Sequence, residues 1–139
     1  EAASKGAYQA GFTDAGSYGC NIILPFEQKK NPYLTKSYQT EFFFVRKFLL
    51  RHSSSALIVF PGGFGTMDEL FESLTLIRTK SIKPIPTILV GTEYWQDLYD
   101  FLSEKALQYG AISQTDLDQL YITDDLDEVI KLIKQSANE

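Results

Sequence analysis

The segment from Leu57 to Glu72, LIVFPGGFGTMDELFE, constrains the fold of this chain more than any other. Its first four residues are apolar, they end at Pro61, and three glycines follow the proline within four positions. A continuous apolar run is typical of a strand that is covered on both faces in a parallel sheet. After the glycines, apolar residues recur at helical spacing as far as Ile77. The segment therefore predicts a buried strand over residues 55–60, a glycine loop, and a helix from Thr66 to Arg78.

The rest of the chain repeats this alternation of strands and helices. Strands are expected at residues 20–26, where Pro25 ends the strand, at 83–91 and near 118–123. Helices are expected at residues 1–9 and 94–110, which Gly11 and Gly110 close, at 37–52, and after an N-cap at Asp124 or Asp125. Such alternation predicts an α/β fold, with a mostly parallel sheet between helical layers. With 139 residues, 44% of them hydrophobic and 22% charged, the chain suits a single domain over residues 1–139. Ligands of such folds bind at the carboxyl ends of strands, where the glycine loop is expected.

The glycine loop suits an anion. Gly62, Gly63 and Gly65 permit positive φ and let a ligand approach the backbone without a Cβ in the way. The first amides of the following helix have no intrahelical partner, and the helix dipole makes that end positive. Loop and helix together predict a phosphate site, and a tight turn without a ligand is the alternative. The segment has no Gly-Lys-Ser/Thr and does not fit G-x-G-x-x-G, so neither a Walker A loop nor a dinucleotide fingerprint is indicated.

Thr66 and Glu69 admit two interpretations. Thr-x-x-Glu is the capping box, in which each side chain binds the backbone amide of the other residue. However, Asp68, Glu69 and Glu72 crowd beside the predicted anion site, where a carboxylate is costly unless it contacts ribose hydroxyls or a water. A cap and a catalytic carboxylate are therefore both open for Glu69, and the two roles are compatible.

The helix expected from Ser37 to His52 is apolar almost all round, which predicts burial on several sides or a covering partner subunit. We therefore expect a homodimer that uses this helix. Arg46 shares a helix face with Phe42 and Leu49, where a guanidinium is costly unless it is paired. Either its stem covers apolar surface, or it is a phosphate or carboxylate clamp, with Lys47 about 100° further round the helix.

Composition argues against several classes of function. A net charge of −5 argues against broad binding to nucleic acid or anionic membranes, and no apolar run reaches the roughly 18 residues of a membrane span. With one cysteine, Cys20, and one histidine, His52, the chain cannot form an internal disulfide or a Cys-based zinc site. A reducing, cytoplasmic setting is the expectation that follows.

Several stretches resemble a known family. PGGFGTMDE, from Pro61 to Glu69, fits the PGGxGTxxE signature of the LOG ("Lonely guy") family of cytokinin-activating phosphoribohydrolases, and this signature is highly specific. FFVRK, from Phe43 to Lys47, resembles the basic pair of that family, and EAASKGA at the start resembles its MEAANKGA helix. LPFEQKKNPY resembles the longer bacterial-type members. Members were long labelled lysine decarboxylase, a label that the residues here do not support.

The resemblance implies a Rossmann-like three-layer α/β/α fold, usually as a dimer. It also implies an activity that requires no metal and no cofactor. It implies hydrolysis of the N-glycosidic bond of a nucleoside 5′-monophosphate, such as AMP or a cytokinin riboside monophosphate, to free base and ribose 5-phosphate. Glu69 would serve the ribose and the attacking water, stabilising an oxocarbenium-like state. Arg46 would be the catalytic or substrate-orienting cation, with Lys47 nearby. The 5′-phosphate would be held by Gly62, Gly63, Gly65 and Thr66.

Two further expectations accompany the resemblance. Some relatives resemble carriers of a phosphorylated cofactor such as molybdenum cofactor, so nucleotide or cofactor binding without hydrolysis is the rival function. The chain has no initiating Met, and its first residues resemble the middle of a helix. We therefore expect the natural chain to begin earlier, with the family's first strand and upstream glycine-rich loop before Glu1.

Overall fold

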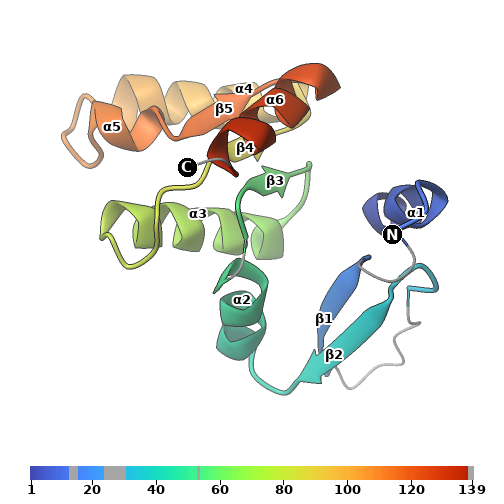
Figure 1. Cartoon of the computed structure of the whole chain (residues 1–139). Coiled ribbons are helices and arrows are strands. Elements are labelled where there is room, and N and C mark those ends of the chain that lie inside the picture. The colour runs from blue at the N-terminus through green and yellow to red at the C-terminus, as the bar shows by residue number, and fades with distance from the viewer. Residues whose placement is uncertain (13–15, 24–30, 53, 138–139) are drawn as a thin grey trace. The chain divides into compact units, whose positions relative to one another are not determined.

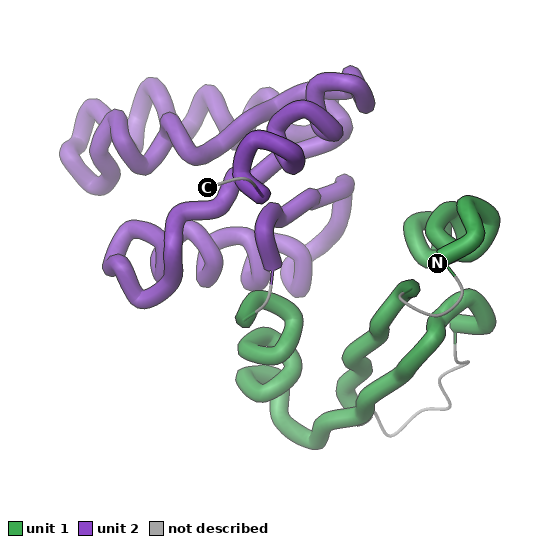
Figure 2. The backbone as a smooth tube through the Cα atoms, viewed as in Figure 1, with its two compact units in different colours: residues 1–53 green, residues 54–139 purple. Residues whose placement is uncertain are grey.

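The computed structural model describes residues 1–12, 16–23, 31–52 and 54–137. The chain forms two compact units, residues 1–53 (unit 1) and residues 54–139 (unit 2), which Figure 2 draws in green and purple. Both units contain parallel strands and helices, so the predicted α/β class is confirmed. The prediction of one domain for the whole chain stays a prediction.

Unit 1 comprises α1 (Ala2–Gln9), β1 (Tyr18–Ile22), β2 (Lys36–Thr40) and α2 (Phe43–His52) (Figure 1). The two strands pair in parallel, with Cys20 opposite Tyr38, and α2 packs against both of them. As predicted, α1 ends before Gly11. The φ of 86° at Gly11 lies in the left-handed region, which explains why a glycine closes this helix.

The helix predicted over residues 37–52 is wrong in its first part. Residues 36–40 form β2, and the helix begins only at Phe43. Tyr38 and Thr40 belong to residue types that favour strands, and the ladder to β1 satisfies their backbone groups, so tertiary pairing decides this stretch. The apolar side chains of α2 are not enclosed either: Phe44 is 67% exposed, and none of the ten residues of this helix is buried.

β1 lies earlier in the chain than predicted. The strand expected at residues 20–26 occupies Tyr18–Ile22. Its expected end at Pro25 lies outside the described residues. The free thiol of Cys20 is buried in this strand, opposite β2.

Unit 2 contains a three-stranded parallel sheet in the order β3-β4-β5 (Figure 1). The strands are β3 (Leu57–Val59), β4 (Thr87–Leu89) and β5 (Leu120–Ile122). The helices are α3 (Phe64–Arg78), α4 (Thr92–Asp100), which continues as the π-helical turn η1 (Phe101–Ala106), α5 (Gln114–Leu117) and α6 (Leu126–Ser136). The strands and long helices of this unit therefore follow the predicted order, whereas α5 was not predicted.

The core of unit 2 lies around its central strand, β4. This strand is buried over its whole length, and Leu70 of α3 and Trp95 of α4 have no exposed surface. Burying a large apolar side chain contributes about 1.5–3 kcal/mol to folding, so these two side chains fix both helices on the sheet. β3, which has β4 as its one neighbour in the described sheet, is less covered. Ile58 is 40% exposed, so the predicted burial of this strand on both faces is wrong.

Two helix ends of unit 2 follow the predicted signals. Gly110, with a φ of 69°, closes the helical segment that begins with α4. Asp125 is the N-cap of α6, and its carboxylate accepts a hydrogen bond from the amide of Asp127 (2.9 Å). Asp124, the other candidate for this cap, binds elsewhere. Within the described ranges, we find no helix with the length and apolar character that crossing a membrane requires.

Candidate functional site

The glycine loop lies at the carboxyl edge of the unit 2 sheet. It spans residues 60–63, between the end of β3 at Val59 and the start of α3 at Phe64. β3 and β4 are parallel, and the amide of Val90 donates to the carbonyl of Val59 (2.9 Å), so the loops that leave the two strands begin side by side. Ligands of parallel α/β sheets bind at this edge.

The start of α3 carries no side-chain cap. Its N-cap is Gly63, and the first backbone hydrogen bond runs from the amide of Met67 to the carbonyl of Gly63 (3.1 Å). The amides of residues 64–66 precede that bond and have no acceptor within the helix. No acidic side chain lies in the first turn. A helix end of this kind suits an anion such as a phosphate.

Of the two interpretations of Thr66 and Glu69, the capping box is wrong. Thr66 is the third residue of α3 and Glu69 the sixth, whereas the box requires the N-cap and the third residue. The helix begins earlier because the extended backbone of Gly63, with φ −91° and ψ −154°, already provides an N-cap. Glu69 is half-buried, and its backbone carbonyl accepts a hydrogen bond from the hydroxyl of Ser73 (2.7 Å). Capping therefore does not account for the Glu69 carboxylate.

Gly62 and Gly63 of the loop and Gly65 in the first turn of α3 are explained in different ways. A Cβ on Gly62 would lie 2.9 Å from the Cβ of Thr66, so packing requires a glycine there. A Cβ on Gly63 or Gly65 would meet no described atom within 4 Å. None of the three has a positive φ, so the left-handed conformations that glycine permits do not explain them. Close approach of a ligand stays the predicted reason for Gly63 and Gly65.

The neighbouring helix α4 begins differently. Its N-cap is Gly91, with a φ of 109°. Oδ1 of Asp124 accepts hydrogen bonds from the amides of Gly91 (2.7 Å) and Thr92 (3.1 Å). Hydrogen bonds from the side chain and backbone of Thr92, and from the backbone of Gly91, hold the pKa of the Asp124 carboxyl below its ordinary value. The chain thus supplies its own anion at the start of α4.

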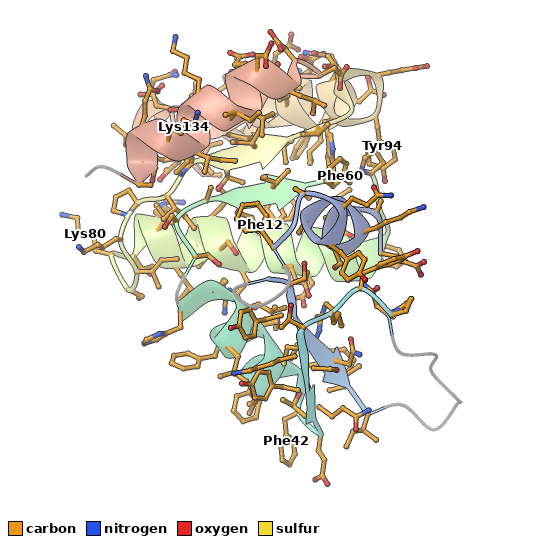
Figure 3. The ribbon with its side chains drawn as sticks, turned by 45° about the vertical axis from the view of Figure 1, so that its right-hand side comes forward. Phe12, Phe42, Phe60, Lys80, Tyr94 and Lys134 are labelled. Atoms are coloured by element: carbon orange, nitrogen blue, oxygen red, sulfur yellow. The ribbon has the colours of Figure 1, made fainter. Side chains whose placement is uncertain are left out.

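Tyr94, which is labelled in Figure 3, joins the start of α4 to the glycine loop by a hydrogen bond. Its hydroxyl donates to the carbonyl of Gly62 over 2.6 Å. Pro61 packs against Gly91, where a Cβ would lie 2.9 Å from Cγ of the proline. Sequence reasoning missed this link. The stretch VGTEYW repeats the strand–glycine–helix order of the first loop, and that repetition is the signal that could have revealed it.

Arg46 and Lys47 occupy consecutive, half-buried positions on α2 in unit 1. Nε of Arg46 donates to the carbonyl of Cys20 in β1 (3.0 Å). This bond holds the guanidinium itself, which differs from a stem that covers apolar surface while its charge stays in water. The predicted site residues thus form two groups: Arg46 and Lys47 in unit 1, and the glycine loop with Thr66 and Glu69 in unit 2.

A cavity of about 300 Å³ lies at the other end of α3. Apolar side chains of unit 2 line most of it, among them Leu74, Ile77 and Leu117. Arg78 and Asp116, also in its lining, approach to 3.5 Å between Nε and Oδ2. The candidate site is therefore a helix start and not this cavity. Across the part of the chain that the structure describes, no group of three or more His, Cys, Asp and Glu side chains is placed to hold a metal ion.

Comparison with known proteins shows the family. The family model described as "Possible lysine decarboxylase" matches residues 1–133. The cytokinin riboside 5′-monophosphate phosphoribohydrolase of Mycobacterium marinum is 32% identical over 96 residues, which cover 66% of this chain and 49% of that protein. Cytokinin riboside 5′-monophosphate phosphoribohydrolase LOG3 of Arabidopsis thaliana is 31% identical over 93 residues, 66% of this chain and 42% of that protein. LOG1 of the same plant is 38% identical over 71 residues, 50% of this chain and 32% of that protein.

The chain thus spans half or less of the length of these curated relatives. The range matched by the family model includes the FFVRK and PGGFGTMDE stretches. Because that model covers nearly the whole chain, this protein belongs to the family it describes, the LOG family.

Proposed function

We propose that this protein hydrolyses the N-glycosidic bond of a nucleoside 5′-monophosphate to free base and ribose 5-phosphate. The observation that carries the proposal is the start of α3, which has no side-chain cap and no acidic residue in its first turn, and is followed within the helix by Glu69. Two relatives of the chain are named cytokinin riboside 5′-monophosphate phosphoribohydrolase, which supports this substrate class. AMP and a cytokinin riboside monophosphate are the candidate substrates.

The 5′-phosphate would bind at the glycine loop and the first turn of α3. Backbone amides at a helix start are donors aligned with the positive end of the dipole. The lack of a Cβ at two glycines would let phosphate oxygens reach the backbone. The threonine hydroxyl of the first turn is a further donor, and its side chain is held against the first glycine. The residues in this role are Gly62, Gly63, Gly65 and Thr66.

Glu69 would act on the ribose and on the attacking water. It follows Thr66 by three residues and so lies on the same face of α3, about 4.5 Å further along the helix axis. This spacing suits a ligand whose ribose follows its phosphate. A carboxylate beside the reacting carbon stabilises positive charge in an oxocarbenium-like state and accepts a proton from water. Glu69 matches the glutamate of the PGGxGTxxE signature and lies outside the helix cap, so chemistry is the role that we propose for it.

Arg46 would be the catalytic or substrate-orienting cation, with Lys47 beside it on α2. This assignment rests on the match of FFVRK to the basic pair of the family. The hydrogen bond from Nε to the carbonyl of Cys20 supports it, because an orienting guanidinium must itself be held in place. An arginine in this role would contact the substrate through its N–H donors.

We also propose that the protein is a homodimer in a reducing, cytoplasmic setting. Phe43, Phe44 and Phe48 of α2 are 58%, 67% and 58% exposed. Large apolar side chains exposed together on one helix commonly mark an interface. The single cysteine fits a reducing compartment. Light scattering at micromolar concentration should give the mass of two chains, and a clean monomer would contradict the dimer.

Incubation of the full-length protein with AMP tests the proposed reaction. We expect adenine and ribose 5-phosphate in equal amounts when the products are separated by chromatography. A panel of base-modified monophosphates, including a cytokinin riboside monophosphate, would then rank the bases by kcat/KM. Tight binding of nucleotides or of a phosphorylated cofactor, without base release anywhere in the panel, would favour the rival carrier function.

A further inference from the structure

A hydrogen bond from the next helix holds the glycine loop. The hydroxyl of Tyr94 donates to the carbonyl of Gly62 over 2.6 Å, and the two residues are 32 positions apart in the sequence. Glycine has more backbone freedom than any other residue type. A loop rich in glycine therefore keeps one conformation only where other parts of the fold hold it. In this loop, the contact from Tyr94 does so at the first glycine.

Tyr94 is 47% exposed, and the packed start of α4 holds its backbone and one side of its ring. Its amide donates to the carbonyl of Gly91 (3.0 Å), and its ring meets that of Trp95 edge-on, with centroids 4.9 Å apart and planes at 85°. Trp95 has no exposed surface, and its Nε1 donates to the carbonyl of Val90 (3.2 Å). The carboxylate of Asp124 binds the first amides of the same helix. The hydroxyl of Tyr94 is therefore presented from a firmly packed helix start.

Fixing the carbonyl of Gly62 also fixes the next amide. In a planar trans peptide, the C=O of one residue and the N–H of the next point in opposite directions. The hydrogen bond from Tyr94 thereby sets the direction of the Gly63 amide at the N-cap of α3. Gly63 is among the residues to which the proposed function assigns the 5′-phosphate.

We propose that Tyr94 is a positioning residue for phosphate binding, which holds the peptide between Gly62 and Gly63 in the orientation that receives the phosphate. The inference rests on the proposed function, because it requires a phosphate at the start of α3. Tyr94 acts through the loop and need not touch the substrate. A tyrosine that only stabilised the fold would change the unfolding transition, but would not distinguish ligands with a phosphate from ligands without one.

Tyr94→Phe in the full-length protein tests this role, since it removes the hydroxyl and keeps the ring against Trp95. The KM for AMP and the Kd for ribose 5-phosphate should each rise by about 2- to 10-fold, the effect of one lost hydrogen bond. The Kd for adenine, which has no phosphate, should change little, and kcat should change less than KM. The melting temperature should fall by no more than a few degrees, the usual effect of one lost hydrogen bond. Tyr109→Phe is the matched control, because it removes the hydroxyl of a tyrosine that is 85% exposed in the same unit.

The possible outcomes separate the inference from the proposed function. If the wild type releases base and Tyr94→Phe has the same KM and Kd, the inference is overturned and the proposed function stands. Equal weakening of adenine and ribose 5-phosphate would also overturn it. If the wild type binds ribose 5-phosphate but releases no base, hydrolysis is overturned and the Kd values still decide the role of Tyr94. A wild type that binds neither AMP nor ribose 5-phosphate overturns both.

Discussion

α3 and α4 begin at the same edge of the unit 2 sheet, after the neighbouring parallel strands β3 and β4, and each has a glycine as its N-cap. At α4, the carboxylate of Asp124 accepts hydrogen bonds from the first amides. At α3, no side chain caps the helix. The two ends have the same dipole and the same orphan amides, so they differ in whether the chain supplies the anion. A helix start becomes a candidate ligand site where the chain leaves out its own carboxylate.

The two N-cap glycines also differ in whether the fold itself requires a glycine at that position. Gly91 has a φ of 109°, a conformation that residues with a side chain rarely adopt, and it packs against Pro61. Gly63 has an extended backbone that any residue can adopt, and its surroundings would accept a Cβ. The fold therefore requires the glycine at the start of α4. At the start of α3, access of a ligand to the backbone is the better explanation for the glycine.

The largest effect is expected from Glu69→Gln, which tests whether the start of α3 takes part in catalysis as well as in phosphate binding. Base release from AMP should fall by about 10²- to 10⁴-fold, the usual contribution of a general base. Because Glu69 is outside the cap, stability in urea should stay within ~1 kcal/mol of wild type, and ribose 5-phosphate should still bind. Glu104→Gln, at an exposed glutamate of η1, should be fully active. Hydrolysis by Glu69→Gln near the wild-type rate would remove this carboxylate from the mechanism.

A smaller effect should separate packing from access within the glycine loop. Gly62→Ala should lower the free energy of unfolding by about 1–3 kcal/mol, the usual cost of overpacking, because the new Cβ lies 2.9 Å from the Cβ of Thr66. Gly63→Ala should leave that free energy nearly unchanged and weaken ribose 5-phosphate binding. Urea unfolding and calorimetry on both variants measure the two effects. Equal destabilisation by the two alanines would contradict the distinction.

The smallest effect concerns the charge at the start of α4. The pKa of Asp124 is lowered from 3.8 in the folded chain, so the ionised carboxylate stabilises the fold above that pH, and this stabilisation is lost as the pH falls below 3.8 toward the folded pKa. Asp124→Asn keeps an acceptor without the charge. Its melting temperature should be below that of the wild type at pH 7, and the difference should shrink at about pH 3. A difference that is the same at both pH values would show that the charge contributes nothing.

Local patterns made much of unit 2 predictable. The helical spacing after the glycines, the N-cap at Asp125 and the closing Gly110 all stand as the sequence indicates. The Thr66 capping-box pattern misled because Gly63 caps the helix three residues earlier. β2 was missed because its residues take their structure from the parallel ladder with β1, which no local pattern reveals.

The features of the site that the sequence did not predict depend on contacts between residues far apart in the chain. The glycine loop was found from its composition, but the contact that holds it and the carboxylate that caps the neighbouring helix were not. Tyr94 lies 32 positions from Gly62, and Asp124 lies 33 positions from Gly91. Which residues meet at such distances depends on which strands are neighbours in the sheet, and the sequence of either segment alone does not specify that.

Gly63→Asp gives the most direct test of the central claim, that α3 leaves its start open for a ligand's phosphate whereas α4 closes its own with Asp124. The extended backbone and open surroundings of Gly63 accept an aspartate, which as an N-cap should keep the stability or raise it by ~0.3 kcal/mol. The account predicts that the folded variant binds ribose 5-phosphate at least roughly 10-fold more weakly in calorimetry, because its own carboxylate occupies the helix start. Gly63→Ser, a cap without charge, should lose less. A folded Gly63→Asp protein with wild-type affinity for ribose 5-phosphate would contradict the account.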